Sequence, residues 1–90
     1  MEIKVLGPGC RKCEKLYETT KEVLAQEGIE AELVKVVKLD EIMKYGVMMT
    51  PGLVIDGEIK AAGKLPRPKK IAEWIRAAQL AQAQAAKTQK

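Results

Sequence analysis

The spacing of apolar positions changes along the chain, and it predicts four strands and three helices. Over residues 11–27 apolar side chains recur at steps of three and four, which is typical of a helix with one buried face, and Gly28 is a natural end for it. Short apolar runs predict strands elsewhere. The expected elements are a strand over residues 2–6, a helix over 11–27, a strand over 30–37, a short helix over 41–45 capped by Asp40, strands over 52–55 and 58–62, and a helix from Pro68.

The order of these elements predicts the fold class. A strand, a helix and a second strand in succession favour a right-handed parallel unit. The Asp56-Gly57 pair between the last two strands is a strong tight-turn signal, so these strands should form an antiparallel hairpin in the same sheet. We therefore expect an α/β fold with the order βαβαββα, a four-stranded mixed sheet and helices on both faces.

The length of 90 residues fits one domain. We expect the domain to cover residues 1–78, with Trp74 in its core. Residues 79–90 are rich in Ala and Gln and have little to bury, so they are expected to form a tail that extends the last helix or frays.

Charge and hydropathy disfavour several classes of function. The 16 Lys and Arg residues outnumber the 12 Asp and Glu residues, but they are scattered with few aromatic residues among them, so no nucleic-acid partner is expected. No apolar run approaches the roughly 18 residues that a membrane span needs. No secretion signal is visible at the start, so a cytoplasmic location is expected, where a close cysteine pair is more often catalytic or metal-binding than structural.

The chemistry of the chain centres on Cys10 and Cys13, which lie between the first strand and the first helix. The free N–H groups and the dipole at a helix start favour an anion, and a thiolate is the reactive form of cysteine. Arg11 and Lys12 between the two sulfurs add positive charge. Since Cys13 falls on the apolar stripe of the helix, Cys10 should be exposed and nucleophilic and Cys13 buried and slower.

A Cys-x-x-Cys pair alone leaves more than one function open. A zinc site needs about four nitrogen or sulfur ligands, whereas this chain has two Cys and no His. The remaining alternatives are a redox dithiol and a soft-metal carrier or sensor that binds Cu(I), Hg(II) or As(III) through both thiolates. Met48 and Met49 could suggest copper, but packing and client contact are the simpler explanation.

Four motifs together resemble the thioredoxin fold, and more closely the short redox-active disulfide proteins that are near glutaredoxin in size. The resemblance covers residues 1–78. The motifs that carry it are Gly9-Cys10-Arg11-Lys12-Cys13, Tyr45-Gly46-Val47, Thr50-Pro51-Gly52-Leu53-Val54-Ile55-Asp56-Gly57 and Gly63. Small copper chaperones also place Cys-x-x-Cys after a first strand, but they usually end in a strand and need no Thr-Pro, so the redox alternative is preferred.

The resemblance implies a thiol–disulfide oxidoreductase with Cys10 as nucleophile and Cys13 as resolving cysteine. It implies protein disulfides as clients, a thioredoxin-reductase-type electron donor, a monomer, and neither a cofactor nor a metal. Where thioredoxins carry a buried acid on the first strand, this chain has Lys4, so the proton of Cys13 would pass to water or to Glu14.

The resemblance also implies a substrate-binding surface around the dithiol. Pro51 should be cis and lie beside the cysteines, which leaves the backbone of Thr50 free to pair with a substrate chain. Typical thioredoxins have Trp before the first cysteine and Gly-Pro between the pair. Here Gly9, Arg11 and Lys12 occupy these positions, so we expect them to contact the client in place of a flat aromatic surface.

Overall fold

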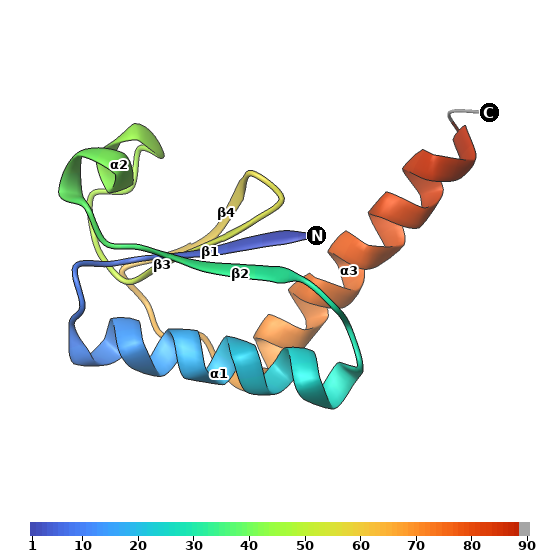
Figure 1. The fold of residues 1–90 in the computed structure, drawn as a ribbon, viewed down its shortest axis with the longest axis horizontal. Coiled ribbons are helices and arrows are strands. Elements are labelled where there is room, and N and C mark those ends of the chain that lie inside the picture. The colour runs from blue at the N-terminus through green and yellow to red at the C-terminus, as the bar shows by residue number, and fades with distance from the viewer. Residues whose placement is uncertain (89–90) are drawn as a thin grey trace.

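The fold, taken from a computed structural model, confirms the expected α/β class (Figure 1). The structure describes the backbone of residues 1–88 and the side chains of residues 1–81. The elements are β1 (Glu2–Leu6), α1 (Arg11–Glu27), β2 (Glu32–Val36), α2 (Leu39–Lys44), β3 (Gly52–Ile55), β4 (Glu58–Ala62) and α3 (Pro68–Thr88). Within the described residues, no helix is both long enough and apolar enough to cross a membrane.

The four strands form one mixed sheet in the order β2-β1-β3-β4. β1 pairs in parallel with β2 and antiparallel with β3, so it lies inside the sheet. β3 and β4 form the expected hairpin, whose turn places Asp56 at φ 48° and Gly57 at φ 82°, the left-handed geometry that such a turn requires. The loop after β1 therefore leaves from the interior of the sheet, and this loop carries the cysteines.

The outer strand β4 contains one extra residue. Leu53 pairs with Ala61 and the next residue, Val54, pairs with Ile59, so Lys60 bulges out of the ladder. The ammonium group of Lys60 lies 3.2 Å from a carboxylate oxygen of Glu58. This edge of the sheet is thus both bulged and charged.

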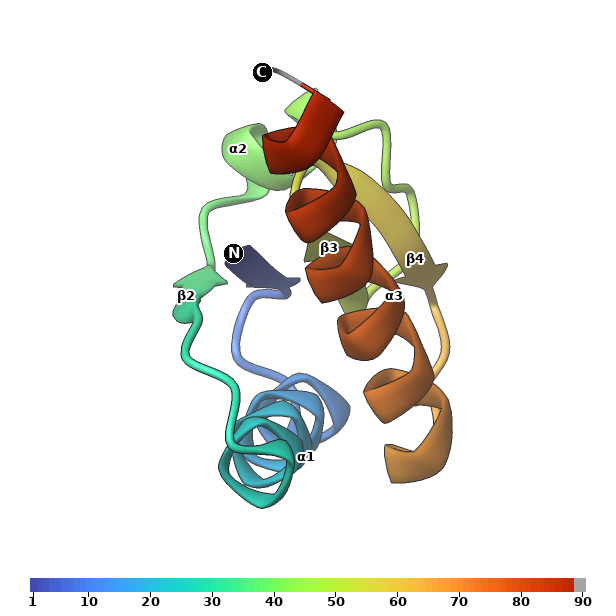
Figure 2. The ribbon, with the colours of Figure 1, turned by 90° about the vertical axis from the view of Figure 1, so that its right-hand side faces the viewer.

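Each face of the sheet has its own apolar cluster, and helices cover both (Figures 1 and 2). α1 and the first half of α3 cover one face, where they enclose the larger cluster, and Trp74 packs half-buried against it. α2 covers the other face over a smaller cluster. The buried members of the larger cluster are Ile3, Val5, Leu16, Val23, Leu24, Leu53, Ile55, Ile71, Ala72 and Ile75, and those of the smaller one are Leu6, Val36, Ile42, Val47 and Val54.

The helix α1, which carries Cys13, is held at both ends. Gly28 adopts the left-handed conformation at φ 65°, and its N–H reaches the carbonyl oxygens of the last turn. In the same region the guanidinium of Arg76 on α3 donates to both carboxylate oxygens of Glu27, at 2.6 and 2.9 Å. This two-point ion pair lowers the pKa of Glu27, chiefly by hydrogen bonding, and it ties α1 to α3.

Two elements, β2 and α2, differ from the sequence-based expectation. β2 covers Glu32–Val36 rather than 30–37, because its parallel partner β1 is five residues long and offers no further pairs. The expectation that Asp40 caps α2 is wrong: the helix begins at Leu39, and its N-cap, Lys38, makes no side-chain capping bond. α3 continues as a helix through Thr88, which is one of the two forms expected for the tail, and residues 89–90 of that tail lie outside the described residues.

Candidate active site

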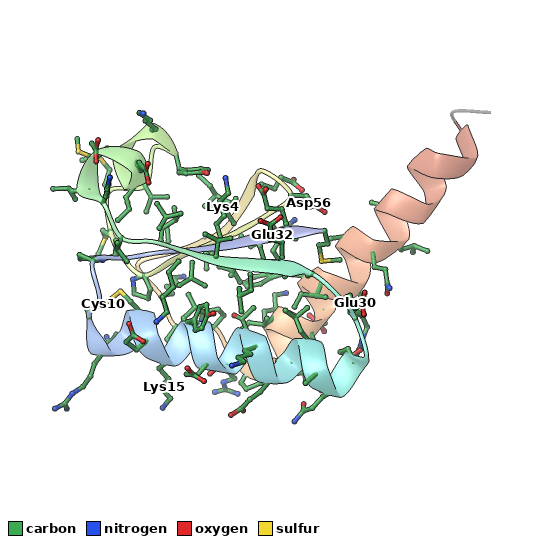
Figure 3. All side chains as sticks on the ribbon, in the orientation of Figure 1. Lys4, Cys10, Lys15, Glu30, Glu32 and Asp56 are labelled. Atoms are coloured by element: carbon green, nitrogen blue, oxygen red, sulfur yellow. A yellow bond between two sulfur atoms is a disulfide. The ribbon has the colours of Figure 1, made fainter. Side chains whose placement is uncertain are left out.

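Cys10 and Cys13 are joined by a disulfide at the start of α1, at one end of the sheet (Figure 3). Cys10 is the N-cap residue, with φ −70° and ψ 164°, and its Sγ accepts a hydrogen bond from the backbone N–H of Cys13 at 3.2 Å. The N-terminal end of a 17-residue helix therefore points its free N–H groups and its positive dipole at this sulfur. On reduction, the same groups stabilise a thiolate at Cys10.

The two sulfur atoms differ sharply in access. Cys10 is exposed, whereas only 4% of Cys13 is accessible. The helical period explains this difference, because Cys13 lies on the buried stripe of α1 with Leu16 and Thr20. An incoming disulfide can reach Cys10 directly but cannot reach Cys13 without a structural change.

Gly7 is a site residue whose contact the sequence does not reveal. It is buried, and a Cβ atom built on it would lie 2.8 Å from the Cβ of Cys13, against the sulfur of that residue, and 3.9 Å from the Cβ of Thr50. Its N–H donates to the carbonyl of Val36 at 2.9 Å. The bare backbone of Gly7 thus lets Cys13 pack closely against the end of β1 and brings the Thr50 loop to the same place.

Thr50 and Pro51 lie on this side of the dithiol, and the peptide bond between them is cis. Pro51 is fully buried, and its carbonyl accepts the N–H of Gly63 at 2.9 Å. Thr50 is half-buried and lines a small groove together with Pro8, two residues before Cys10. The structure therefore brings together the two cysteines and the Thr-Pro segment, which are far apart in the sequence.

The remaining residues expected at the site surround Cys10 on its exposed side. Gly9 adopts φ 97°, a left-handed conformation that glycine takes without strain, and it has open space around it. Arg11 and Lys12 are exposed in the first turn of α1. Their positive charges and the open space at Gly9 surround the exposed side of Cys10.

Lys4 does not face the dithiol. It lies on the face of the sheet that α2 covers, where its ammonium donates to the hydroxyl of Tyr45 at 2.6 Å and lies 3.3 Å from the carboxylate of Glu2 (Figure 3). The hydrogen bond to Tyr45 and then that to Glu2 raise the pKa of Lys4. The cation therefore holds α2 to β1 rather than acting on Cys13.

Glu14 is also engaged in a contact of its own. Its carboxylate accepts a hydrogen bond from the ammonium of Lys35 on β2 at 2.8 Å, which raises the pKa of Lys35. The same ammonium lies 4.5 Å from the ring centroid of Tyr17 on α1. These contacts fix the first turns of α1 against the edge of the sheet and so help to position the dithiol.

Metal-ligating side chains do not gather elsewhere in the part of the chain that the structure describes. Within residues 1–88, no three His, Cys, Asp or Glu side chains form a group that could hold an ion. The donors that a soft metal could use here are Cys10 and Cys13 themselves, and in this structure each sulfur is bonded to the other.

Comparison with known proteins agrees with this geometry. Residues 1–76 match the thioredoxin domain family. A thioredoxin of Methanocaldococcus jannaschii is 39% identical over 74 residues, which cover 82% of this chain and 85% of that protein. A thioredoxin of Methanothermobacter thermautotrophicus is 35% identical over 71 residues, or 79% of this chain and 92% of that protein. The chain belongs to the thioredoxin family.

Proposed function

We propose that Cys10 attacks the disulfides of client proteins and that Cys13 resolves the resulting intermediate. Membership of the thioredoxin family, together with the Cys10–Cys13 disulfide, makes the chain a thiol–disulfide oxidoreductase that acts on protein disulfides. The observation that carries the division of roles is the exposed sulfur at the helix N-cap beside a sulfur that is only 4% accessible.

The reaction starts from the reduced protein. The Cys10 thiolate attacks one sulfur of the client disulfide, the client S–S bond breaks, and a mixed disulfide forms as one client thiolate leaves. The Cys13 thiolate then attacks the Sγ of Cys10, the second client thiolate leaves, and the Cys10–Cys13 disulfide closes. Two electrons pass from the dithiol to the client, each client thiolate takes up a proton, and the protein is left in the oxidised state seen here.

The surroundings of the dithiol suggest how each step is helped. The N–H of Cys13, the helix dipole and the charges of Arg11 and Lys12 favour the thiolate of Cys10 in the first step. In the second step Cys13 must lose a proton. Because the carboxylate of Glu14 is held by Lys35, we assign water as the proton acceptor.

The client contacts are part of the same proposal. The backbone of Thr50, held beside the dithiol by Pro51, pairs with an extended client segment, while Gly9, Arg11 and Lys12 contact the other side of the attacked disulfide. The proximity of Thr50 to Gly7, and through it to Cys13, supports this arrangement.

We further propose that a thioredoxin-reductase-type donor returns two electrons to the disulfide, and that the protein works as a monomer in the cytoplasm. A reducing compartment is where a Cys-x-x-Cys pair is more often catalytic than structural, which supports this location. The functional unit in this proposal is residues 1–78.

The test is the reduction of a protein disulfide with dithiothreitol as electron source. Wild-type protein should be active, Cys10→Ser should be inactive, and Cys13→Ser should accumulate a mixed disulfide on Cys10 that mass spectrometry identifies. In the reduced wild type, an alkylating agent should modify Cys10 well before Cys13.

Two outcomes would change the assignment. Faster alkylation of Cys13, or a trapped adduct on Cys13, would reverse the two roles. An inactive wild type that binds one Cu(I) or Hg(II) tightly through both thiolates would favour the soft-metal alternative.

A further inference from the structure

A groove between β4 and the start of α3 gathers positive charge, and we call it the basic groove. Its volume is about 590 Å³, and all the residues that line it fall within residues 60–74. Four of them are cationic and none is acidic; the cationic ones are Lys60, Lys64, Arg67 and Lys70. Figure 2 shows β4 continuing through a short loop into the start of α3, so one continuous stretch of chain builds the whole groove.

The inner side of the basic groove is apolar. Ala61, Leu65 and Trp74 line it, and each is half-buried because it also packs against the larger core cluster. Trp74, the single tryptophan of the chain, thus has a second role beside the core packing expected from the sequence. Tryptophan and arginine are enriched where proteins bind one another, so this combination is typical of an interaction surface.

The fold itself neutralises little of this positive charge. Lys64 and Arg67 are exposed and make no ion pair with any described residue. Lys70 lies 3.4 Å from a carboxylate oxygen of Glu73 and 5.7 Å from the ring centroid of Trp74. Cations near the start of a helix are disfavoured by its dipole, and the first turn of α3 contains no acidic residue to offset them. The charge is therefore available to carboxylates of a partner.

The exposure of these cations indicates what kind of partner fits. A small-molecule pocket encloses most of its ligand, whereas Lys64, Arg67 and Lys70 are all exposed. Exposed charges of this kind steer and speed the association of complementary protein surfaces. A nucleic acid fits less well, because Trp74 is the one aromatic side chain in the lining and strands bind by stacking several bases.

We propose that the basic groove is a second protein-binding surface, which takes an acidic polypeptide segment that carries one large apolar side chain. The apolar side chain covers Leu65 and Trp74, and the carboxylates on either side of it pair with Lys64 and Arg67. The inference goes beyond the proposed function, because none of the residues assigned to disulfide exchange lines this groove. A partner docked there stays close to the dithiol protein without occupying either cysteine, which raises its local concentration.

The test follows the fluorescence of Trp74 in the oxidised wild-type protein, with isothermal titration calorimetry as a second measurement. The probe is the end-blocked peptide Glu-Glu-Leu-Glu-Glu, which should bind saturably. Replacing its four Glu by Gln should abolish binding. Replacing its Leu by Ser should weaken binding about tenfold, the lower end of the scale for an apolar group that enters an apolar pocket. Binding should also be lost at about 1 M salt, where charges are screened beyond roughly 3 Å.

Two double variants locate the binding site. Lys64→Gln, Arg67→Gln should weaken peptide binding about fivefold, the scale of two exposed ion pairs. The matched control is Lys15→Gln, Lys21→Gln, which removes the same charge from two exposed lysines of α1 and should keep the affinity of the wild type. Both variants should keep the circular dichroism spectrum of the wild type and its rate of cystine reduction.

The outcomes separate this inference from the proposed function. Absence of saturable binding, or an equal loss of affinity in the two double variants, would overturn the inference and leave the exchange activity in place. Tighter binding of single-stranded DNA or of inorganic phosphate than of the peptide would assign the groove to another class of ligand and overturn it as well. Self-association that is lost in Lys64→Gln, Arg67→Gln would show that a second copy fills the groove, which would overturn the assignment to a different protein.

Discussion

Replacing Gly7 by Ala should disturb the dithiol on its buried side, where Cys13 packs against Gly7. The added Cβ would lie 2.8 Å from the Cβ of Cys13 and against its sulfur. Carbon atoms pack best at about 3.5–4.0 Å, so the two groups must separate by close to an ångström. Neither group is the free end of a flexible side chain: Cys13 belongs to α1 and is bonded to Cys10.

The expected cost follows from this overlap. An extra methyl group forced into a close-packed site costs about 1–3 kcal/mol of unfolding free energy. In a domain of this size, each kcal/mol corresponds to about 4–8 °C in melting temperature. Because the displaced group is Cys13, to which we assign the resolving step, the second step of the exchange should also slow, and the mixed disulfide should persist longer.

Gly52→Ala provides the matched control. Gly52 is also a buried glycine at this end of the sheet, but a Cβ there would meet its nearest atoms at 3.4–3.5 Å, which is ordinary contact. Urea denaturation of both oxidised variants measures stability, and mass spectrometry after rapid acid quenching measures the lifetime of the mixed disulfide. If Gly7→Ala matched wild type in both measurements, the close packing of Gly7 on Cys13 would have no energetic role and our reasoning would be refuted.

Two further predictions concern the rest of the fold. Glu27→Gln removes the ion pair with Arg76 that lowers the pKa of Glu27. A carboxyl group whose pKa is lowered by folding stabilises the folded protein at pH values above its unfolded-state pKa. This stabilisation is lost as the pH falls through the folded-state pKa. The variant should therefore be less stable than wild type near neutral pH and equal to it in acid, as measured by urea midpoints across pH, and an identical pH profile for the two proteins would contradict the role of this pair. A chain that ends at Ala78 should keep disulfide-reducing activity and change in stability by less than about 1 kcal/mol, because Ile75 is the last fully buried side chain among residues 68–81, the part of α3 whose side chains are described. Loss of cooperative thermal unfolding, followed by circular dichroism, would show that the last part of α3 belongs to the domain.

The fold could be predicted from the sequence because the local sequence patterns for helices, strands and turns agree with one another. The helical period over residues 11–27, the left-handed glycine that ends this helix and the Asp56-Gly57 turn each predict the element that the structure contains. The length of β2 could not be predicted from such local patterns. It depends on the number of residues that β1 offers for pairing, which is a property of the sheet rather than of the local sequence.

The candidate site was predictable to a similar depth. The helical period places Cys10 at the open helix start and Cys13 on the buried face. The contact between Gly7 and Cys13, and the hydrogen bond from Lys4 to Tyr45, depend on where backbone segments and side chains meet after folding. The short helix α2 shows the same limit, since Asp40 has the right chemistry for a cap but the chain enters the helix before reaching it.

The bulge at Lys60 affects how the edge of the sheet interacts with the client proteins that this protein meets. A thiol-exchange protein works on chains whose disulfides are accessible, and such chains include partly folded ones with unpaired strands. An open sheet edge is a template for these strands, and pairing with them leads toward aggregation. The extra residue in β4 breaks the regular spacing of its hydrogen-bonding groups, and Lys60 and Glu58 place opposite charges on that strand. The β4 edge of the sheet is thus poorly suited to recruit a foreign strand from such a chain.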